Sequence, residues 1–321
     1  MAYSRYYRRM LTPEEKPFYD ALVVGFKRMN AEICVPYAPH LNIDRSVQAV
    51  HLDYPELFYV DFSSVVYCRS LPISKIMVSY HVSARIAREQ SDAIDRAATS
   101  LARDCAGKPL LETEQLLHDR LVKLCAYGTV PGREHDAHNI RGAFLDHLCV
   151  CEGYAKAYKY LCDMAKLQCL VVLGDATPPF QDPGPHAWNM VNLNGNVYHV
   201  DVTFDRLIDD QFISKAYFNL SDDQIRYDHM PYTSMFSVPA SPISGTIIPM
   251  IGGTRQLMDY LRIEHARHVP CSEVLLTKGF PENNFLPMMQ NKLSAGDRAW
   301  FYSIKASYYR KGARSLVIVW R

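Results

Sequence analysis

Three short stretches of this chain carry the residue types of a cysteine-based catalytic site. They are CEGYA at 151–155, HAWN at 186–189 and YHVDVTFD at 198–205. Cys151 supplies a thiol, His186 an imidazole and Asp201 a carboxylate. A thiol nucleophile needs a base that takes its proton, and the base needs a group that orients it. If the three side chains meet, the stretches predict acyl transfer through a thioester.

Cys151 stands where a helix is predicted to begin, and that helix is expected to run to about Lys166. Free backbone N–H groups and the helix dipole at an N-terminus stabilise a thiolate, and a nearby imidazolium adds to this. The N–H of Cys151 is also a candidate donor to an oxyanion, an interaction worth ~10²–10³ in rate. Glu152 works against the thiolate unless its charge points to solvent.

The base and the carboxylate fall on a predicted β-hairpin. Asn194-Gly195 is a strong two-residue turn signal between two β-rich runs. With that turn, side-chain alternation puts four residues on one face: His186, Trp188, Asp201 and Thr203. The α-carbons of His186 and Asp201 are then expected roughly 7–8 Å apart, within reach of a hydrogen bond between the side chains. A one-residue slip in register would place the two on opposite faces.

Alternatives remain open for some of these residues. His199 lies on the same predicted face as Asp201 and is a rival base. Cys149 precedes Cys151 by two residues, but Cys151 is the better candidate because Glu-Gly-Tyr-Ala follows it directly. Trp188 is expected to pack over the site and keep water out.

The loop at 127–143 also contains residues that can do chemistry. Four of them are Glu134, His135, Asp136 and His138. Their density, with the His-Asp pairs at 118–119 and 135–136, is compatible with a divalent metal and a metal-dependent hydrolase. Further ligands at diagnostic spacing are not evident, so we predict a polar loop with no metal and no cofactor. The loop can wall the substrate site, and we name His138 and Asn139, with Trp188, as candidate lining residues.

Hydrophobic periodicity and turn residues predict the surrounding elements. Helices are expected at 12–30, 44–52, 84–106, 112–126, 151–166, 255–265 and 283–293. Strands are expected at 57–62, 63–82, 169–173, 186–193, 196–204 and 273–278, with two more around 298–320. The resulting α+β protein is predicted to have an N-terminal α+β domain at 1–109, a catalytic core at 110–235, a linker at 236–253 and a small C-terminal α+β domain at 254–321.

The three motifs, in this order and with similar gaps, resemble the core of the transglutaminase-like superfamily, especially its bacterial branch. The resemblance is clearest over 144–205 and extends over about 110–235. It implies a papain-like core, in which a helix carrying Cys151 packs on an antiparallel sheet, with His186 as base and Asp201 as orienting acid. DYPELFYV at 53–60 resembles segments that precede this core in related bacterial proteins. Phe204 is a departure, because the family commonly has tryptophan there.

The composition argues against nucleic-acid and membrane partners. The 321 residues are 48% hydrophobic and 21% charged, with a formal net charge of +1. That charge offers no large positive field for nucleic acid, and no run approaches the ~20 apolar residues that span a bilayer. The nine scattered cysteines include no double CxxC pattern, and the N-terminus shows no secretion signal, so a reducing, cytoplasmic compartment is expected.

The function predicted first is therefore hydrolysis of a peptide or isopeptide bond in a protein or peptide substrate. Transamidation by the same triad is the first alternative, because it differs only in the acceptor that reaches the thioester. A non-catalytic binding or scaffold protein that keeps the fold is the second. The intact Cys-His-Asp set argues against it, since a relic is expected to lose one member.

Overall fold

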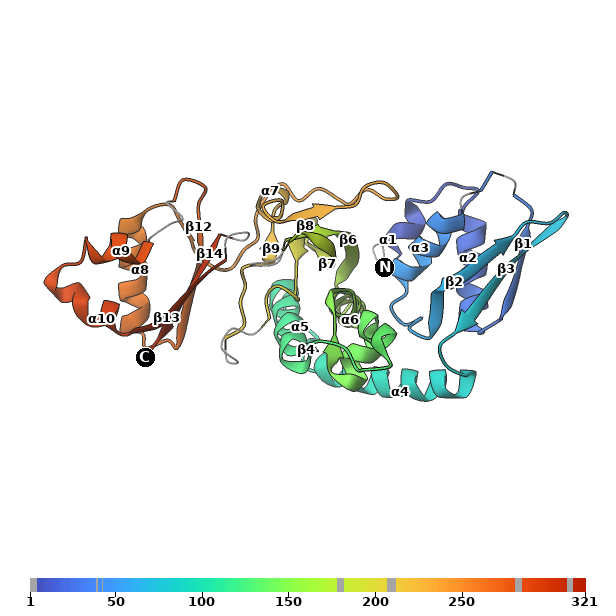
Figure 1. Cartoon of the computed structure of the whole chain (residues 1–321), viewed down its shortest axis with the longest axis horizontal. Helices are drawn as coiled ribbons and strands as arrows, with labels where there is room; N and C mark the ends of the chain where they lie inside the picture. The colour runs from blue at the N-terminus through green and yellow to red at the C-terminus, as the bar shows by residue number, and fades with distance from the viewer. Residues whose placement is uncertain are drawn as a thin grey trace. The chain divides into compact units, whose positions relative to one another are not determined.

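The structure is a computed structural model that describes residues 5–38, 40, 41, 43–177, 182–206, 212–280, 285–310 and 314–321 (Figure 1). Its helices are α1 (Tyr6–Arg9), α2 (Lys16–Lys27), α3 (Ile43–Asp53), α4 (Ala84–Leu101), α5 (Leu110–Leu124), α6 (Cys151–Met164), α7 (Asp222–Ile225), α8 (Thr254–Ala266), α9 (Phe285–Gln290) and α10 (Arg298–Tyr302), with the short 3₁₀ or π turns η1 (Glu134–His138), η2 (Gly142–Asp146) and η3 (Ala295–Asp297). Its strands are β1 (Glu32–Pro36), β2 (Val60–Cys68), β3 (Ile73–Tyr80), β4 (Ala126–Tyr127), β5 (Leu148–Cys149), β6 (Gln168–Ala176), β7 (Gly184–Leu193), β8 (Asn196–Val200), β9 (Phe218–Leu220), β10 (His229–Pro231), β11 (Met250–Ile251), β12 (Cys271–Leu276), β13 (Ile304–Arg310) and β14 (Ser315–Trp320).

The strands form four sheets with the orders β1-β3-β2, β10-β6-β7-β8-β9, β11-β12-β14-β13 and β4-β5 in the described chain. Most of the described pairings are antiparallel, among them β1 with β3, β2 with β3, β12 with β14 and β13 with β14. Helices and mainly antiparallel sheets in one chain confirm the predicted α+β class.

The chain forms two compact units. The first comprises Met1–Gly174, His186–Val197 and Pro231–Ala240, and the second comprises Asp175–Pro185, Tyr198–Met230 and Ser241–Arg321. The chain passes from one unit to the other more than once, so neither unit is one continuous stretch of sequence.

In the first unit, the N-terminal sheet buries one face. Inward residues alternate with exposed ones along β1 and β3, as expected for a strand with one solvated side. Helices α2 and α3 lie beside this sheet (Figure 1), and their buried residues join its core. The Asp53 carboxylate at the end of α3 accepts hydrogen bonds from the backbone N–H groups of Tyr7 and Arg8 and from the hydroxyl of Tyr19. This buried carboxylate ties α1, α2 and α3 together.

Helices α5 and α6 form the helical part of the first unit. Both bury apolar residues, and α6 is almost wholly enclosed from Gly153 to Lys159. The Tyr158 hydroxyl donates to the Glu114 carbonyl of α5 at 3.4 Å. On the other side, the Asn189 side chain of β7 donates to the Ala155 carbonyl of α6 at 2.9 Å and to the Leu170 carbonyl of β6 at 3.2 Å. Helix α6 is therefore held between a helix and a sheet.

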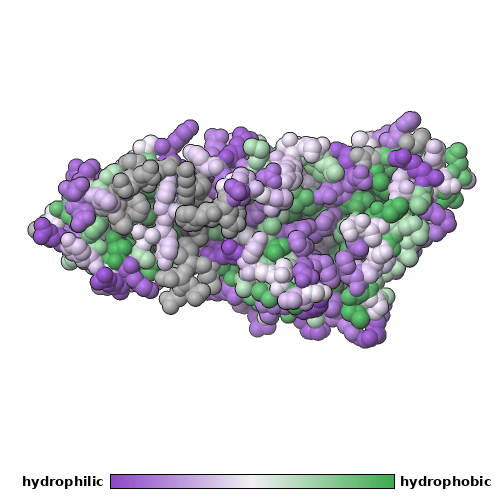
Figure 2. Space-filling view, in the orientation of Figure 1, coloured by the Kyte–Doolittle hydropathy of each residue, from purple (hydrophilic) through white to green (hydrophobic). Residues whose placement is uncertain are grey.

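In the second unit, the C-terminal sheet β11-β12-β14-β13 has its own apolar core with α8, α9 and α10. All six residues of β14 are buried. The Glu273 carboxylate of β12 is also buried and accepts hydrogen bonds from the Ser214 hydroxyl, the Lys215 N–H and the Ser315 hydroxyl. On the face seen in Figure 2, hydrophilic and hydrophobic residues are interspersed.

Several predicted boundaries were wrong. Helix α2 begins at Lys16 and not at 12, because Thr12 and Glu15 bond each other's backbone N–H groups in a turn that precedes the helix. The predicted break near residue 62 is absent: β2 continues to Cys68 with an irregular register after Asp61, and the chain then turns into β3. Strand β1 was missed, and α10 occupies the start of the region predicted as strand. Helix α4 ends at Leu101, five residues earlier than predicted.

The other long elements agree with the sequence analysis. Helices α3, α5, α6 and α8 and strands β7 and β12 lie within a few residues of the predicted ranges. Helix α9 covers part of the range predicted as 283–293, of which residues 283 and 284 lie outside the described residues. The Asn194-Gly195 turn is confirmed, with φ of 55° and 94° at its two residues.

Candidate active site

Cys151 is the first residue of α6, as the sequence predicted, and its side chain is half-buried. The preceding residue, Val150, is extended (φ −95°, ψ −178°) and gives the helix no side-chain cap. Ser, Thr, Asp or Asn would normally occupy that position and accept a hydrogen bond from the first turn. Valine cannot accept one, so no cap side chain occupies the N–H groups of the first turn beside the thiol.

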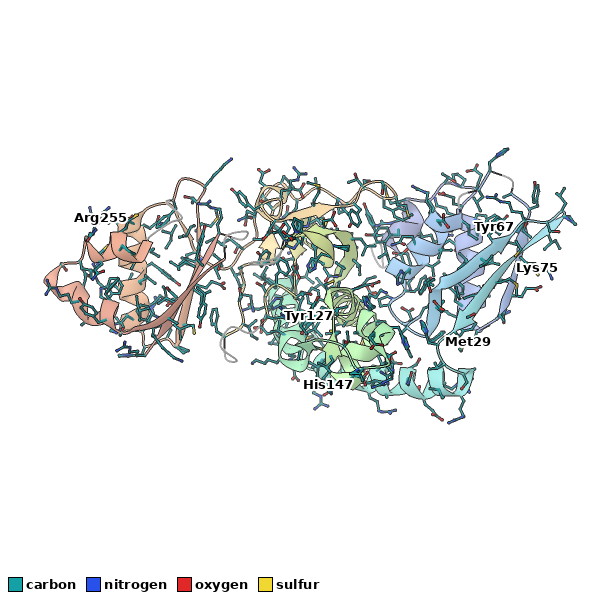
Figure 3. The ribbon with its side chains drawn as sticks, viewed as in Figure 1. Met29, Tyr67, Lys75, Tyr127, His147 and Arg255 are labelled. Atoms are coloured by element: carbon teal, nitrogen blue, oxygen red, sulfur yellow. The ribbon has the colours of Figure 1, made fainter. Side chains whose placement is uncertain are left out.

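Hydrogen bonds to β4 hold the segment that precedes Cys151. The chain leaves η2 through His147, whose φ of 55° is left-handed, and enters β5 (Figure 3). Strand β5 pairs with β4 in parallel, with Tyr127 opposite Cys149. The N–H of Ala126 donates to the His147 carbonyl at 3.0 Å, and the N–H of Gly128 donates to the Cys149 carbonyl at 3.2 Å. The residues just before Cys151 are thus held against β4.

Packing explains why Gly153 and Tyr154 follow Cys151 in the motif. A Cβ at Gly153 would collide with the Ala137 carbonyl oxygen and would lie 2.7 Å from the Cys149 Cβ. The Tyr154 hydroxyl donates to the Cys125 carbonyl from a fully buried position. Glycine therefore lets α6 approach the loop at η1, and tyrosine fixes the helix to the end of α5.

The loop at η1 lies against the start of α6. The Val150 N–H donates to the Ala137 carbonyl at 3.0 Å. Behind it, Arg141 pairs with both Asp136 and Asp146, and Arg133 pairs with Asp146. This chain of ion pairs holds the loop that the sequence analysis placed beside the site.

Two of the predicted lining residues differ in their surroundings. The Asn139 side chain is buried, donates to the His135 carbonyl and accepts from the Arg141 N–H, so it shapes the loop. The His138 side chain is 54% exposed, and its Nδ1 lies 3.1 Å from Glu152 Oε2. Its exposed ring can therefore meet a ligand, whereas Asn139 mainly supports the backbone.

The charge of Glu152 is compensated inside the protein. Lys156 Nζ lies 2.9 Å from its carboxylate, and His51 Nε2 lies 3.3 Å from it. Burial alone would raise the pKa of Glu152, but Lys156, His138 and His51 outweigh burial and hold the pKa below its ordinary value. Burial and the Lys156 charge lower the pKa of His51 to about 3. Glu152 was expected to oppose a thiolate, and its ion pair with Lys156 reduces that effect.

A cavity of about 220 Å³ lies in the first unit next to this cluster. Its polar wall comes from η1 and α6, and its apolar wall comes from residues 54–62. The lining includes His51, His81, His135, His138, Asn139, Glu152, Lys156, Phe58 and Phe62. The residue that follows Cys151 therefore contributes to the wall of an open cavity.

His186 lies near the start of β7. Its ring stacks on the Trp188 ring, with centroids 6.1 Å apart and an angle of 19° between the planes. This contact confirms that the two residues share a face of the strand. Trp188 is 1% exposed and belongs to the core of the first unit.

Asp201 belongs to the second unit and lies just after β8, which ends at Val200. The prediction that Asp201 and Thr203 extend the strand was wrong. The Asp201 Oδ1 atom accepts hydrogen bonds from the N–H groups of Thr203 (2.8 Å) and Phe204 (3.1 Å), which bends the chain into a turn. Asp201 is fully buried, so these bonds fix its carboxylate in one orientation.

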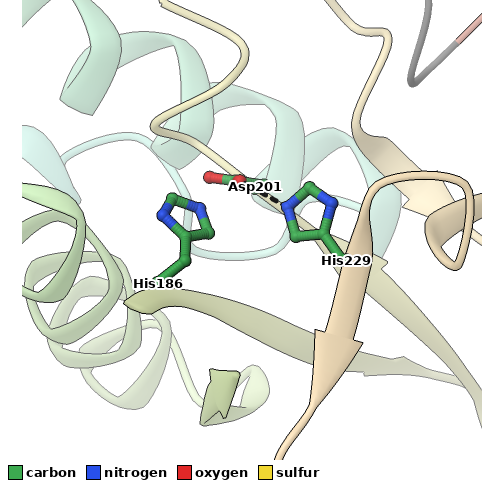
Figure 4. Close-up of side chains that lie close together, drawn as sticks. All are labelled: His186, Asp201 and His229. Carbon is green, nitrogen blue, oxygen red and sulfur yellow. Dashed lines mark hydrogen bonds and ion pairs between the residues drawn. The ribbon is translucent and has the colours of Figure 1, made fainter. Parts of the chain in front are cut away.

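Sequence reasoning missed His229. Its Nε2 lies 3.0 Å from Asp201 Oδ2, and its Nδ1 lies 2.6 Å from Asp228 Oδ1. Figure 4 draws the hydrogen bond between Asp201 and His229, with His186 in the same view. Burial alone would lower the pKa of His229, but the two carboxylates outweigh burial and raise it. The Asp228-His229 dipeptide was the available signal, and it was overlooked because it stands outside the three motifs.

The rival base His199 is 1% exposed, and its Nε2 lies 2.8 Å from Asp222 Oδ1 at the start of α7. Burial lowers the pKa of His199. This enclosed pair indicates a structural role for His199 within the second unit.

The four polar residues of the η1 loop make contacts with the protein. Glu134 accepts from the Gly132 N–H at 2.9 Å, and Asp136 is paired with Arg141 and Arg133. Among the described residues, none of the four belongs to a group of three potential ligands within 4.8 Å of one another. These contacts favour a polar loop over the metal site weighed in the sequence analysis.

No family model and no curated protein matches this chain. Solved structures resemble parts of it. A TGase structure gives a TM-score of 0.32 at 11% identity, over 58% of this chain and 54% of its own. A candidate cysteine protease from Cytophaga hutchinsonii gives 0.29 at 12% identity, over 41% and 51%. Menin, in a structure that reveals its binding site for the Mixed Lineage Leukemia protein, gives 0.28 at 14% identity, over 56% and 42%.

This chain spans about half the length of the TGase and of the candidate protease. TM-scores at this level are too low to establish a shared fold. Every helix within the described residues is too short or too polar to cross a membrane.

Proposed function

We propose that this protein is a cysteine-dependent acyl-transfer enzyme acting on amide bonds, with Cys151 as nucleophile, His186 as base and Asp201 as the group that orients His186. The observation that carries the proposal is the start of α6: a half-buried thiol on the first turn of a helix that has no side-chain cap. Helix N–H groups stabilise both a thiolate and an oxyanion, and a cap would compete for them.

The reaction has two halves. The Cys151 thiolate attacks the carbonyl carbon, and the N–H of Cys151 donates to the oxyanion. The C–N bond breaks as the His186 imidazolium gives its proton to the leaving amine, which leaves a thioester. His186 then takes a proton from water as the water oxygen bonds to the thioester carbon, the C–S bond breaks, and a carboxylic acid and the thiolate are released.

Hydrolysis of a peptide or isopeptide bond is the preferred outcome, with a protein or peptide as substrate. We assign part of the substrate to the cavity beside Glu152, where His138 is exposed and Phe58 and Phe62 offer apolar surface. Trp188 is assigned the role of excluding water around His186, in keeping with its burial and the stacked rings. No metal or cofactor takes part in this scheme.

The test is alkylation with iodoacetamide at pH ~6, with each modified cysteine located by mass spectrometry, because an ordinary thiol is almost wholly protonated there. Cys151 is expected to react at least about tenfold faster than Cys271, which is also half-buried but begins a strand. His186→Ala and Asp201→Ala should remove that advantage.

Cys34→Ser and Cys68→Ser serve as the background for all variants, because these two thiols are exposed and would otherwise consume reagent. Equal rates at Cys151 and Cys271 in the folded protein would reject the nucleophile and favour a non-catalytic binding protein.

A further inference from the structure

The second unit contains a buried histidine that the proposed mechanism does not use. His229 and Asp201 both have fully buried side chains, and the Asp228 side chain is 4% exposed. The imidazole lies between the two carboxylates, with one ring nitrogen directed at each. A buried charge is retained only when it is paired, so this arrangement of three ionisable groups needs an explanation.

The contacts of His229 favour its imidazolium form. A neutral imidazole has one N–H and one lone pair, so it can donate to only one carboxylate. The other nitrogen would then present its lone pair to a carboxylate oxygen. The imidazolium has two N–H groups and satisfies both oxygens at 2.6 and 3.0 Å.

The surroundings hold the imidazolium in place. The Tyr217 hydroxyl donates to the second oxygen of Asp228 at 2.6 Å. The rings of Phe204 and Tyr217 pack against the His229 ring, with centroids 4.9 and 5.5 Å away. Titratable groups near it in the second unit include His199, paired with Asp222, and Asp205, which accepts from the Tyr217 N–H.

We propose that His229 is a positioning residue: as an imidazolium anchored by Asp228, it fixes the orientation of the Asp201 carboxylate and offsets its charge in a site closed to water. This role rests on the proposed function, in which Asp201 orients His186. Asp201 then has Oδ1 held by two backbone N–H groups and Oδ2 held by His229.

The charge count supports this role. Asp201 and Asp228 carry two negative charges, and the imidazolium reduces the total to one. One remaining negative charge can stabilise the second imidazolium, His186, which pairs with the thiolate. Without His229, the two buried carboxylates would share a proton, so Asp201 itself would carry less of the negative charge that supports His186.

The experiment measures the Cys151 alkylation rate as a function of pH in wild type, His229→Gln and His229→Leu. The acid limb of the profile is the pH range in which the alkylation rate rises as the thiol ionises. Loss of the His229 cation should move this limb upward by about one pH unit, which slows labelling at pH ~6 about tenfold. At pH ~9, where thiols are largely ionised, the rates should agree within about twofold. Wild-type profiles in folded variants would overturn the proposal.

His199→Gln is the matched control, because His199 is an equally buried histidine of the same unit that pairs with a single carboxylate, Asp222. Its alkylation profile should equal that of wild type. A purely structural role for His229 would instead lower the rate at every pH or reduce the melting temperature without moving the acid limb.

A second measurement does not depend on the variants folding. Two-dimensional ¹H–¹⁵N NMR of the histidine rings in the wild-type chain should show His229 with two protonated nitrogens at pH ~8, where an ordinary histidine is neutral. A neutral His229 ring would refute the imidazolium, and with it the proposal. If wild-type Cys151 shows no advantage in alkylation while His229 is doubly protonated, the proposed function fails and not the assignment of charge.

Discussion

The N-termini of α6 and α7 are built in opposite ways. At α7, the Ser221 side chain accepts from the Gln224 N–H, and the Gln224 side chain accepts from the Ser221 N–H, which is a complete capping box. At α6, Val150 stands at the same position and offers no oxygen. Helix α7 caps its first turn with its own side chains, whereas α6 has no side-chain cap and begins with a half-buried cysteine.

The difference lies in the groups available to the first-turn N–H groups of the two helices. A capping residue is worth about 1 kcal/mol, and α6 does without it at its N-terminus. Both helices have an acid in the first turn, Glu152 in α6 and Asp222 in α7, and each acid is paired with cationic or imidazole groups. Helices α4, α5 and α8 also lack a side-chain cap hydrogen bond, so the distinctive feature of α6 is the half-buried thiol on its open first turn.

The largest effect is expected from Gly153→Ala. The new methyl group would collide with the Ala137 carbonyl oxygen and crowd Cys149, so α6 must move away from the η1 loop. We expect a loss of about 3 kcal/mol of unfolding free energy by urea denaturation and at least tenfold slower alkylation of Cys151 at pH ~6.

Gly128→Ala is the matched control for that substitution. A Cβ there would lie 3.5 Å from the nearest atom, a Leu148 side-chain carbon, which is an ordinary contact. If Gly128→Ala were as damaging as Gly153→Ala, close approach of α6 to the loop would not be the reason for the glycine.

Val150→Thr tests the comparison directly, because threonine has the shape of valine and adds a capping hydroxyl. The new cap should stabilise the protein by about 0.5–1 kcal/mol and raise its melting temperature. The same hydroxyl would compete for the first-turn N–H groups, so alkylation of Cys151 at pH ~6 should slow about threefold to tenfold. Faster alkylation together with higher stability would mean that the open first turn does not support the thiolate.

Ser221→Ala is the converse substitution at α7. It removes both halves of the capping box and should cost about 1 kcal/mol in thermal or urea unfolding. Alkylation of Cys151 should stay unchanged within experimental error. A large change in alkylation would show that the cap of α7 is coupled to the cysteine.

A further test concerns the pH dependence of stability. The pKa of His51 is lowered to about 3 from an ordinary 6.5, so the unfolded chain binds a proton between these values and the folded chain does not. Stability should therefore fall as the pH drops from about 6.5 toward 3. Glu152 contributes only below its ordinary pKa of 4.5, and buried His199 acts in the same direction as His51.

His51→Gln should flatten this acid dependence of the unfolding free energy between pH 6.5 and 4.5, since glutamine does not titrate. His199→Gln should flatten it independently, because the two histidines belong to different clusters. A slope that is unchanged in both variants would show that neither buried imidazole controls the acid sensitivity.

Much of the positioning could be predicted from sequence. The turn at Asn194-Gly195, the start of α6 at Cys151 and the shared face of His186 and Trp188 follow from local rules, namely turn chemistry, helix periodicity and strand alternation. These rules depend on residues close together in the chain, so one sequence contains the information they need.

The surroundings of the site could not be predicted in the same way. The Glu152 cluster brings together His51, His138 and Lys156, which come from three separate segments. His229 contacts Asp201 although the two residues are 28 positions apart in the sequence. It lies on β10, a strand that the sequence pattern did not predict. Asp201 leaves its strand because its carboxylate captures two following N–H groups, a local competition that side-chain alternation ignores.

The most direct test of a catalytic Cys151 is to detect its thiolate. The ultraviolet absorbance of thiolate is compared between wild type and Cys151→Ser in the native protein as the pH is raised from about 4. For a catalytic Cys151, we expect the difference to be already present at pH ~6, where an ordinary thiol is protonated, and to be removed by His186→Ala. A difference that appears only near pH ~8.5, with or without His186, would contradict a catalytic Cys151.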